Sequence, residues 1–141
     1  MSMRESDIFI LHPALGMLGR VMFTLIFFLS GITHFTDRAS YVALMPAGIP
    51  FRPFWVMISG AVELLGATMI ATNRYPRLGA WLIVIFLVPV TATVHGYLML
   101  HAPDEANRQI QLSFVLKGIT MIGSALLITQ LGVGRSHRDG R

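Results

Sequence analysis

Four long apolar stretches alternate with short polar segments along the chain, at residues 14–35, 53–72, 78–100 and 110–131. Each stretch holds about twenty residues, the length of helix that crosses a hydrocarbon core ~30 Å thick. The pattern predicts an all-α fold, an integral membrane four-helix bundle with short loops. We expect residues 1–13 to form a cytoplasmic or interfacial segment and residues 132–141 a basic disordered tail, with no second folded domain.

Prolines divide the chain between and within these stretches. Residues 38–45 have the length of one short interfacial helix, and the prolines that follow end it. Pro53 falls in the first turn of the second stretch, where a missing backbone N–H is harmless. Pro89 lies inside the third stretch, where it removes a backbone hydrogen bond and is expected to kink the helix unless its neighbours compensate.

Composition supports a membrane protein and excludes several other classes. Hydrophobic residues make up 54% of the chain and charged residues 13%, against roughly 25% charged in soluble proteins. The net charge of +4 comes from scattered Lys and Arg, without the dense basic patch that nucleic acid binding needs. The chain contains no Cys, so a redox role would need a bound cofactor or a partner protein.

The basic residues outside the apolar stretches also predict the orientation. Six of them belong to the N-terminal segment, the second loop and the tail, and three to the first and third loops. Since basic residues accumulate on the cytoplasmic side, both termini are expected to face the cytoplasm of a multi-pass protein in the cell's inner membrane.

Every apolar stretch carries an ionisable residue, in chain order Arg20, Glu63, His95 and Lys117, and His34 lies at the end of the first stretch. A charge in the middle of a membrane span costs roughly 2.5–3.5 kcal/mol, so it requires a partner or a function. Small and polar residues share the helix face of each of these groups at three-and-four spacing. Such faces pack against one another in membranes, so we expect the five groups to converge inside the bundle.

Glu63 is the natural centre of this cluster because it is the one acidic residue within the predicted spans. Its carboxylate could accept two hydrogen bonds from Arg20 or a single contact from Lys117. Two interpretations stay open. The Arg20–Glu63 pair could be a structural ion pair that fixes the helix register, or the cluster could form a ligand-binding site or proton relay. No catalytic residue can be assigned from the pattern.

The two histidines of the cluster, His34 and His95, are predicted to lie at similar depths on different helices. Two histidines could ligate a haem, but without a third protein ligand they make a poor zinc site. We therefore predict no metal site and do not favour haem. Hydrogen bonding or proton exchange with a bound head group or a quinone carbonyl suits them better.

Several short motifs carry a family resemblance. SGITHF ends the first span, GIPFRPFW precedes the second, SGAVELLGA surrounds Glu63 and VHG contains His95. Together with the early Arg20, they resemble the DoxX family over residues 16–131. The resemblance implies a four-helix transmembrane domain (14–131) with Arg20, Glu63 and His95 in its polar core. Some members of that family are subunits of thiosulfate:quinone oxidoreductase, so it also implies action beside partner proteins. The placing of Lys117 in this polar core rests on its helical spacing alone and not on the resemblance.

Two classes of function follow from these observations. The first is an accessory or membrane subunit of a quinone-linked redox system, with a quinone as its cofactor and a partner protein or a second copy beside it in the lipid bilayer. The alternative is a non-enzymatic binder or carrier of a lipid or small ligand, or a membrane scaffold for a partner protein. A self-contained enzyme ranks below both, because the chain lacks phosphate-binding glycine loops, a metal-ligand set and a nucleophile–base pair.

Overall fold

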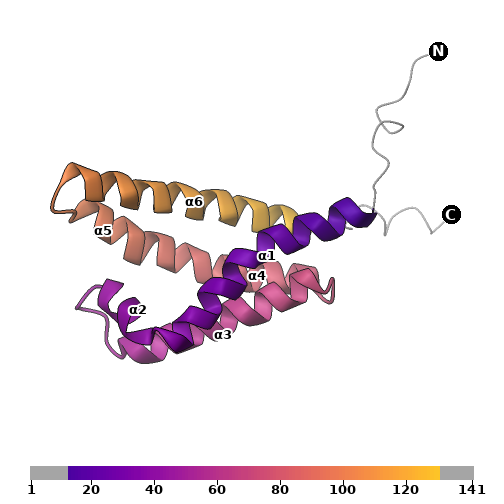
Figure 1. Cartoon of the computed structure of the whole chain (residues 1–141), viewed down its shortest axis with the longest axis horizontal. Coiled ribbons are helices and arrows are strands. Elements are labelled where there is room, and N and C mark those ends of the chain that lie inside the picture. The colour runs from indigo at the N-terminus through magenta and orange to yellow at the C-terminus, as the bar shows by residue number, and fades with distance from the viewer. Residues whose placement is uncertain (1–12, 131–141) are drawn as a thin grey trace, which may run out of the picture.

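A computed structural model describes residues 13–130 of the 141-residue chain, and in this range the backbone is helical apart from short turns (Figure 1). In chain order the elements are α1 (Pro13–Thr36), α2 (Arg38–Leu44), α3 (Arg52–Ala71), α4 (Pro76–Pro89), the π-helix η2 (Val90–Gly96), α5 (Tyr97–Leu100) and α6 (Glu105–Gln130). The predicted N-terminal segment, apart from Pro13, and the predicted tail lie outside the described residues.

Four helical segments are long and apolar enough to cross a membrane: Ala14–Thr36, Arg52–Ala71, Pro76–Leu100 and Glu105–Gln130. These segments confirm the prediction of an all-α chain with four long apolar helices. Three of them begin within two residues of the predicted stretches, while α6 begins five residues earlier, at Glu105. The short helix predicted after the first span is confirmed as α2.

The long helices pack in the order α1, α3, α4 and α6, so that α3 and α4 lie between the two outer helices. The start of α1 and the end of α6 lie at the same end of the molecule (Figure 1). Phe27 of α1 and Ala125 of α6 belong to one apolar core with Ile70 of α3 and Ile83 of α4. Burial of these side chains holds the helices together in the absence of any disulfide.

Glycines allow the middle helices to approach closely. A Cβ atom on Gly66 of α3 would lie 2.9 Å from the carbonyl oxygen of Gly79 in α4, and one on Gly79 would lie 2.7 Å from that of Gly66. In the same way, a Cβ atom on Gly118 of α6 would collide with the side chain of Thr91 in η2. Close contact through small residues is typical of helix packing in membranes.

The irregularity predicted at Pro89 takes the form of a π-helix. Pro89 is the last residue of α4, and residues Val90–Gly96 continue the helix as η2. The hydroxyl of Thr93 donates a hydrogen bond to the carbonyl oxygen of Pro89 at 2.8 Å. Segments of π-helix absorb local changes in helix register and occur frequently at functional sites. This one contains His95, one of the predicted site residues.

Candidate functional site

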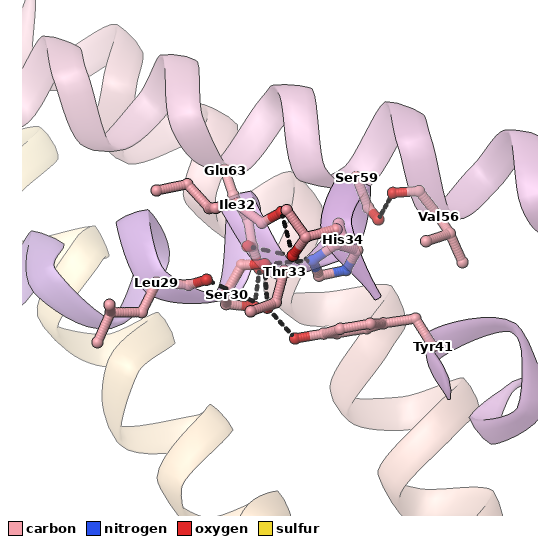
Figure 2. Close-up of polar contacts among 10 residues, drawn as sticks. Leu29, Ser30, Ile32, Thr33, His34, Tyr41, Val56, Ser59 and Glu63 are labelled. Atoms are coloured by element: carbon pink, nitrogen blue, oxygen red, sulfur yellow. Dashed lines mark hydrogen bonds and ion pairs between the residues drawn. The ribbon is translucent and has the colours of Figure 1, made fainter. Parts of the chain in front are cut away.

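Glu63 is buried in the contact between α3 and α1, with 1% of its surface exposed. Figure 2 shows its carboxyl group directed toward the last turns of α1. The hydroxyl of Ser30 donates a hydrogen bond to Oε1 of Glu63 at 3.3 Å. Oε2 has no hydrogen-bond partner and lies 3.7 Å from Nδ1 of His34. One oxygen of a fully buried carboxyl group is therefore left without a donor.

His34 lies beside this carboxyl group and is held on three sides. Its Nδ1 atom is 2.8 Å from the carbonyl oxygen of Ser30, which can only accept, so Nδ1 carries a hydrogen. The ring of Tyr41 in α2 lies 4.0 Å from the imidazole, centroid to centroid, and that of Phe86 in α4 lies edge-on at 6.2 Å. These contacts leave Nε2 of a neutral His34 as a hydrogen-bond acceptor.

A hydrogen bond between hydroxyl groups extends the site to α2. The hydroxyl of Tyr41 lies 2.6 Å from Oγ1 of Thr33, and Oγ1 also lies 2.8 Å from the carbonyl oxygen of Ser30. Figure 2 shows these groups on one side of α1, around Glu63. Two helices and the short connecting helix thus each contribute polar side chains to a single network.

Two glycines explain why Glu63 reaches α1 at this level. A Cβ atom on Gly60 would lie 2.6 Å from Cβ of His34 and 3.1 Å from the carbonyl oxygen of Gly31, and one on Gly31 would lie 2.8 Å from Cγ of Leu64. Helices α1 and α3 are therefore in backbone contact here. Glu63 follows Gly60 by one turn, which brings its side chain to the same face of α3.

The buried pair can hold a proton in either of two places. An ionised carboxylate in an apolar interior is costly unless a positive partner faces it. The network is consistent with a neutral carboxylic acid beside a neutral imidazole, or with a carboxylate beside an imidazolium at 3.7 Å. Either state offers a hydrogen-bond donor to a third group, from Oε2 in the first and from the imidazolium in the second.

Arg20 is not part of this network, so the predicted Arg20–Glu63 ion pair is not formed. In the part of the chain that the structure describes, the ion pairs are His34–Glu63 and Arg108–Glu105. Glu63 meets α1 at Ser30, ten residues beyond Arg20, or about 15 Å along the helix. Span boundaries alone do not show at which level two helices cross, so the sequence could not show that Arg20 and Glu63 lie apart.

The side chain of Arg20 instead lies back along α1. Its Nη1 atom is 3.6 Å from the position that a Cβ atom on Gly16 would take, and its buried Nε atom has no hydrogen-bond partner. Long basic side chains extend toward the membrane surface in this way. Arg20 therefore belongs to the opposite end of α1 from the Glu63 network.

His95 and Lys117 both contact Phe114 but do not join Glu63. Nδ1 of His95 lies 3.0 Å from Oε1 of Gln111, and its ring stacks on Phe114 at 5.0 Å. The Nζ atom of Lys117 lies 5.3 Å from the centroid of the same phenyl ring. No hydrogen bond or ion pair within residues 13–130 connects this group with the Glu63 network. The five predicted residues thus fall into two groups and a separate Arg20.

Sequence reasoning missed Ser30, Thr33, Tyr41 and Gln111. Ser30 and His34 are four residues apart on one helix, so their shared face could have been recognised. Tyr41 reaches His34 only through the turn between α1 and α2, which no spacing rule predicts. Within the described range, no three His, Asp or Glu side chains lie close enough together to hold a metal ion.

Comparison with known protein families gives a match over most of the described chain. The profile of a family described as "Domain of unknown function (DUF8561)" matches residues 23–127. This range includes Ser30, His34, Glu63, His95 and Lys117, while Arg20 lies before it. No match was found among curated proteins or among solved structures.

Proposed function

The chain belongs to the DUF8561 family, a domain family of unknown function. We propose that it is a multi-pass membrane protein whose Glu63–His34 pair binds a quinone head group. In this role it serves as an accessory or membrane subunit of a redox system. The four long apolar helices support the membrane location. The resemblance of its motifs to the DoxX family, which includes subunits of a quinone oxidoreductase, supports the choice of ligand.

The single observation that carries the proposal is the unpartnered Oε2 atom of buried Glu63. Buried polar atoms normally have a hydrogen-bond partner, and a quinone carbonyl is an acceptor that a protonated carboxyl group can serve. A bound quinone supplies two-electron, two-proton chemistry. Glu63 and His34 hold one transferable proton, at Oε2 of a neutral Glu63 or at Nε2 of an imidazolium, and Tyr41 and Phe86 limit the motion of the His34 ring.

Electrons reach such a ligand from a partner protein, because the chain offers no thiol for the transfer. Orientation with both termini on the cytoplasmic side of the inner membrane agrees with the distribution of basic residues. The start of α1 and the end of α6 share one end of the molecule, as that orientation requires (Figure 1).

The test is an absorbance spectrum of the detergent-purified protein, with mass analysis of the small molecules that co-purify. We expect a quinone with the wild type and at least a tenfold lower quinone content with Glu63→Gln. Glu105→Gln is the matched control, since Glu105 is exposed at the start of α6, and it should retain the wild-type content. Preparations that carry only bulk lipid, or equal quinone in wild type and Glu63→Gln, would refute the proposal.

A second candidate is a membrane scaffold or carrier in which Glu63 acts only in packing. The observation that favours it is that Glu63 lies at the closest contact of α1 with α3, beside Gly31 and Gly60. In that case Glu63→Gln alters the thermal stability or the assembly with a partner, and the wild type carries no quinone.

A further inference from the structure

Lys117 is a cation on the exposed side of a long apolar helix. Its side chain lies at the surface of α6, between Leu116 and Ile119, which are 55% and 57% exposed. Its one described contact is with the ring of Phe114. The nearest acidic residue along α6 is Glu105, twelve residues away or about 18 Å, and it already pairs with Arg108. No ion pair among the described residues includes Lys117, so its counter-charge comes from outside them.

Gln111, six residues before Lys117 on α6, offers a second donor. The amide oxygen of Gln111 accepts the hydrogen bond from Nδ1 of His95, so the amide nitrogen of Gln111 keeps both of its N–H groups for another acceptor. Phe114 touches both His95 and Lys117. The four side chains are thus linked in series across η2 and α6: His95 positions Gln111 and stacks on Phe114, and Phe114 supports Lys117.

The position of the group favours the head of a lipid. Lys117 lies seven residues inside the apolar stretch that begins at residue 110, or about 10 Å. Its Nζ atom lies over Phe114, toward the start of α6, which is the direction in which a lysine side chain reaches the membrane surface. A phosphate group offers several acceptor oxygens, and these suit an ammonium group and an amide N–H together.

A second copy of this chain does not supply the missing charge. A symmetric contact through the exposed side of α6 would place Lys117 near its own counterpart, and like charges at close range are unfavourable. The acidic residues described at this end of α6, Asp104 and Glu105, lie outside the apolar stretch. An ordinary two-fold dimer through this surface would therefore leave Lys117 uncompensated.

We propose that Lys117 and Gln111, held by His95 and Phe114, bind the phosphate group of an anionic phospholipid on the outer face of η2 and α6. The site rests on the membrane location argued under the proposed function, and it is separate from the Glu63–His34 pair. The lipid satisfies the charge of Lys117, with its acyl chains along the exposed apolar side chains of α6.

Native mass spectrometry of the detergent-purified protein tests this site. The protein is supplied with phosphatidylglycerol or phosphatidylcholine, and we expect tighter retention of phosphatidylglycerol. Lys117→Gln should reduce the retained phosphatidylglycerol at least fivefold, while Lys117→Arg should keep it, which guards against a fold defect. Arg108→Gln is the control, because Arg108 is a cation near the same helix end that already has an acidic partner.

Two results would overturn the lipid site. One is equal retention of phosphatidylglycerol by wild type and Lys117→Gln. The other is its complete displacement by millimolar inorganic phosphate, which would identify a site for free anions. The same preparations report the quinone content, which Lys117→Gln should leave unchanged. The retained lipid and the quinone content therefore report on the two proposed sites independently.

Discussion

At the scale of single residues, Glu63 both joins α1 to α3 and carries a carboxyl oxygen without a hydrogen-bond partner. Ser30 satisfies one of its carboxyl oxygens, and no side chain or backbone donor satisfies the other. An unmet hydrogen bond on a buried group costs about 1–3 kcal/mol. A residue chosen only to join α1 and α3 would not require a carboxyl group, because a smaller polar side chain could accept from Ser30. The unmet oxygen is therefore the feature that a packing role leaves unexplained.

Gly60 allows a direct test of how α1 and α3 meet. In Gly60→Ala the added methyl group would lie 2.6 Å from Cβ of His34 and 3.1 Å from a backbone oxygen. Overpacking of this kind costs about 1–3 kcal/mol, so we expect a lower midpoint of thermal unfolding in detergent and weaker ligand binding, because His34 must shift.

Gly19→Ala is the matched control for that substitution. Gly19 lies in α1, the helix that Gly60 of α3 contacts, but a Cβ atom there meets nothing within 4 Å, and alanine favours a helix. Its unfolding midpoint should equal or exceed that of the wild type. If Gly60→Ala were as stable as Gly19→Ala, the close contact of α1 and α3 described here would be incorrect.

At the scale of elements, α6 is fixed at its start by Asp104. The backbone N–H of Asn107 donates to Oδ1 of Asp104 at 2.8 Å, and the Asn107 amide donates to Oδ2 at 2.8 Å. These hydrogen bonds to the carboxylate lower the pKa of Asp104 from its usual value of 3.8. The arrangement is an N-cap, which satisfies a backbone donor that the first turn of a helix leaves free.

Asp104→Ala should lower the midpoint of thermal unfolding at neutral pH by a few degrees, and Asp104→Asn should lower it less, because an amide oxygen still caps the helix. Since folding lowers the pKa of Asp104, its carboxylate stabilises the protein above the usual pKa. That contribution is lost as the pH falls through the lowered value. The difference between wild type and Asp104→Ala should therefore shrink at pH 3. An undiminished difference at low pH would show that the carboxylate is not the capping group.

The elements also show where sequence reasoning succeeds. Long apolar runs determine which segments become long helices, and α1, α3 and the α4–α5 segment begin where those runs begin. The effects of proline on the helices are also predicted from the sequence. Pro53 lies in the first turn of α3, and Pro89 directly precedes the irregular segment η2. In this π-helix Thr91 packs closely against Gly118 of α6, a contact that periodicity does not reveal.

At the scale of the whole molecule, the helices form a row in which α1 and α6 are the outer members and remain largely exposed. A bilayer would cover these apolar surfaces, as the proposed location requires. The row also decides which polar residues meet. Of the five groups that spacing predicted to converge, His95 and Lys117 lie against the same Phe114 ring, because η2 and α6 are adjacent. The prediction failed for Arg20 and Glu63, because the level at which α1 crosses α3 is set by Gly31 and Gly60 rather than by distance from the span ends.

The central claim is that the Glu63–His34 pair, and not Arg20, binds the head group of a quinone. Calorimetric titration of the detergent-purified protein with a short-chain benzoquinone tests it most directly, with Glu63→Gln and Arg20→Gln compared with the wild type. A hydrogen bond that involves a charged group contributes roughly 1.5–3 kcal/mol. The imidazolium that the Glu63 carboxylate stabilises is such a donor, so Glu63→Gln should raise the Kd at least tenfold. Arg20→Gln should leave it within about twofold. Unchanged affinity in Glu63→Gln, or a loss confined to Arg20→Gln, would contradict the account.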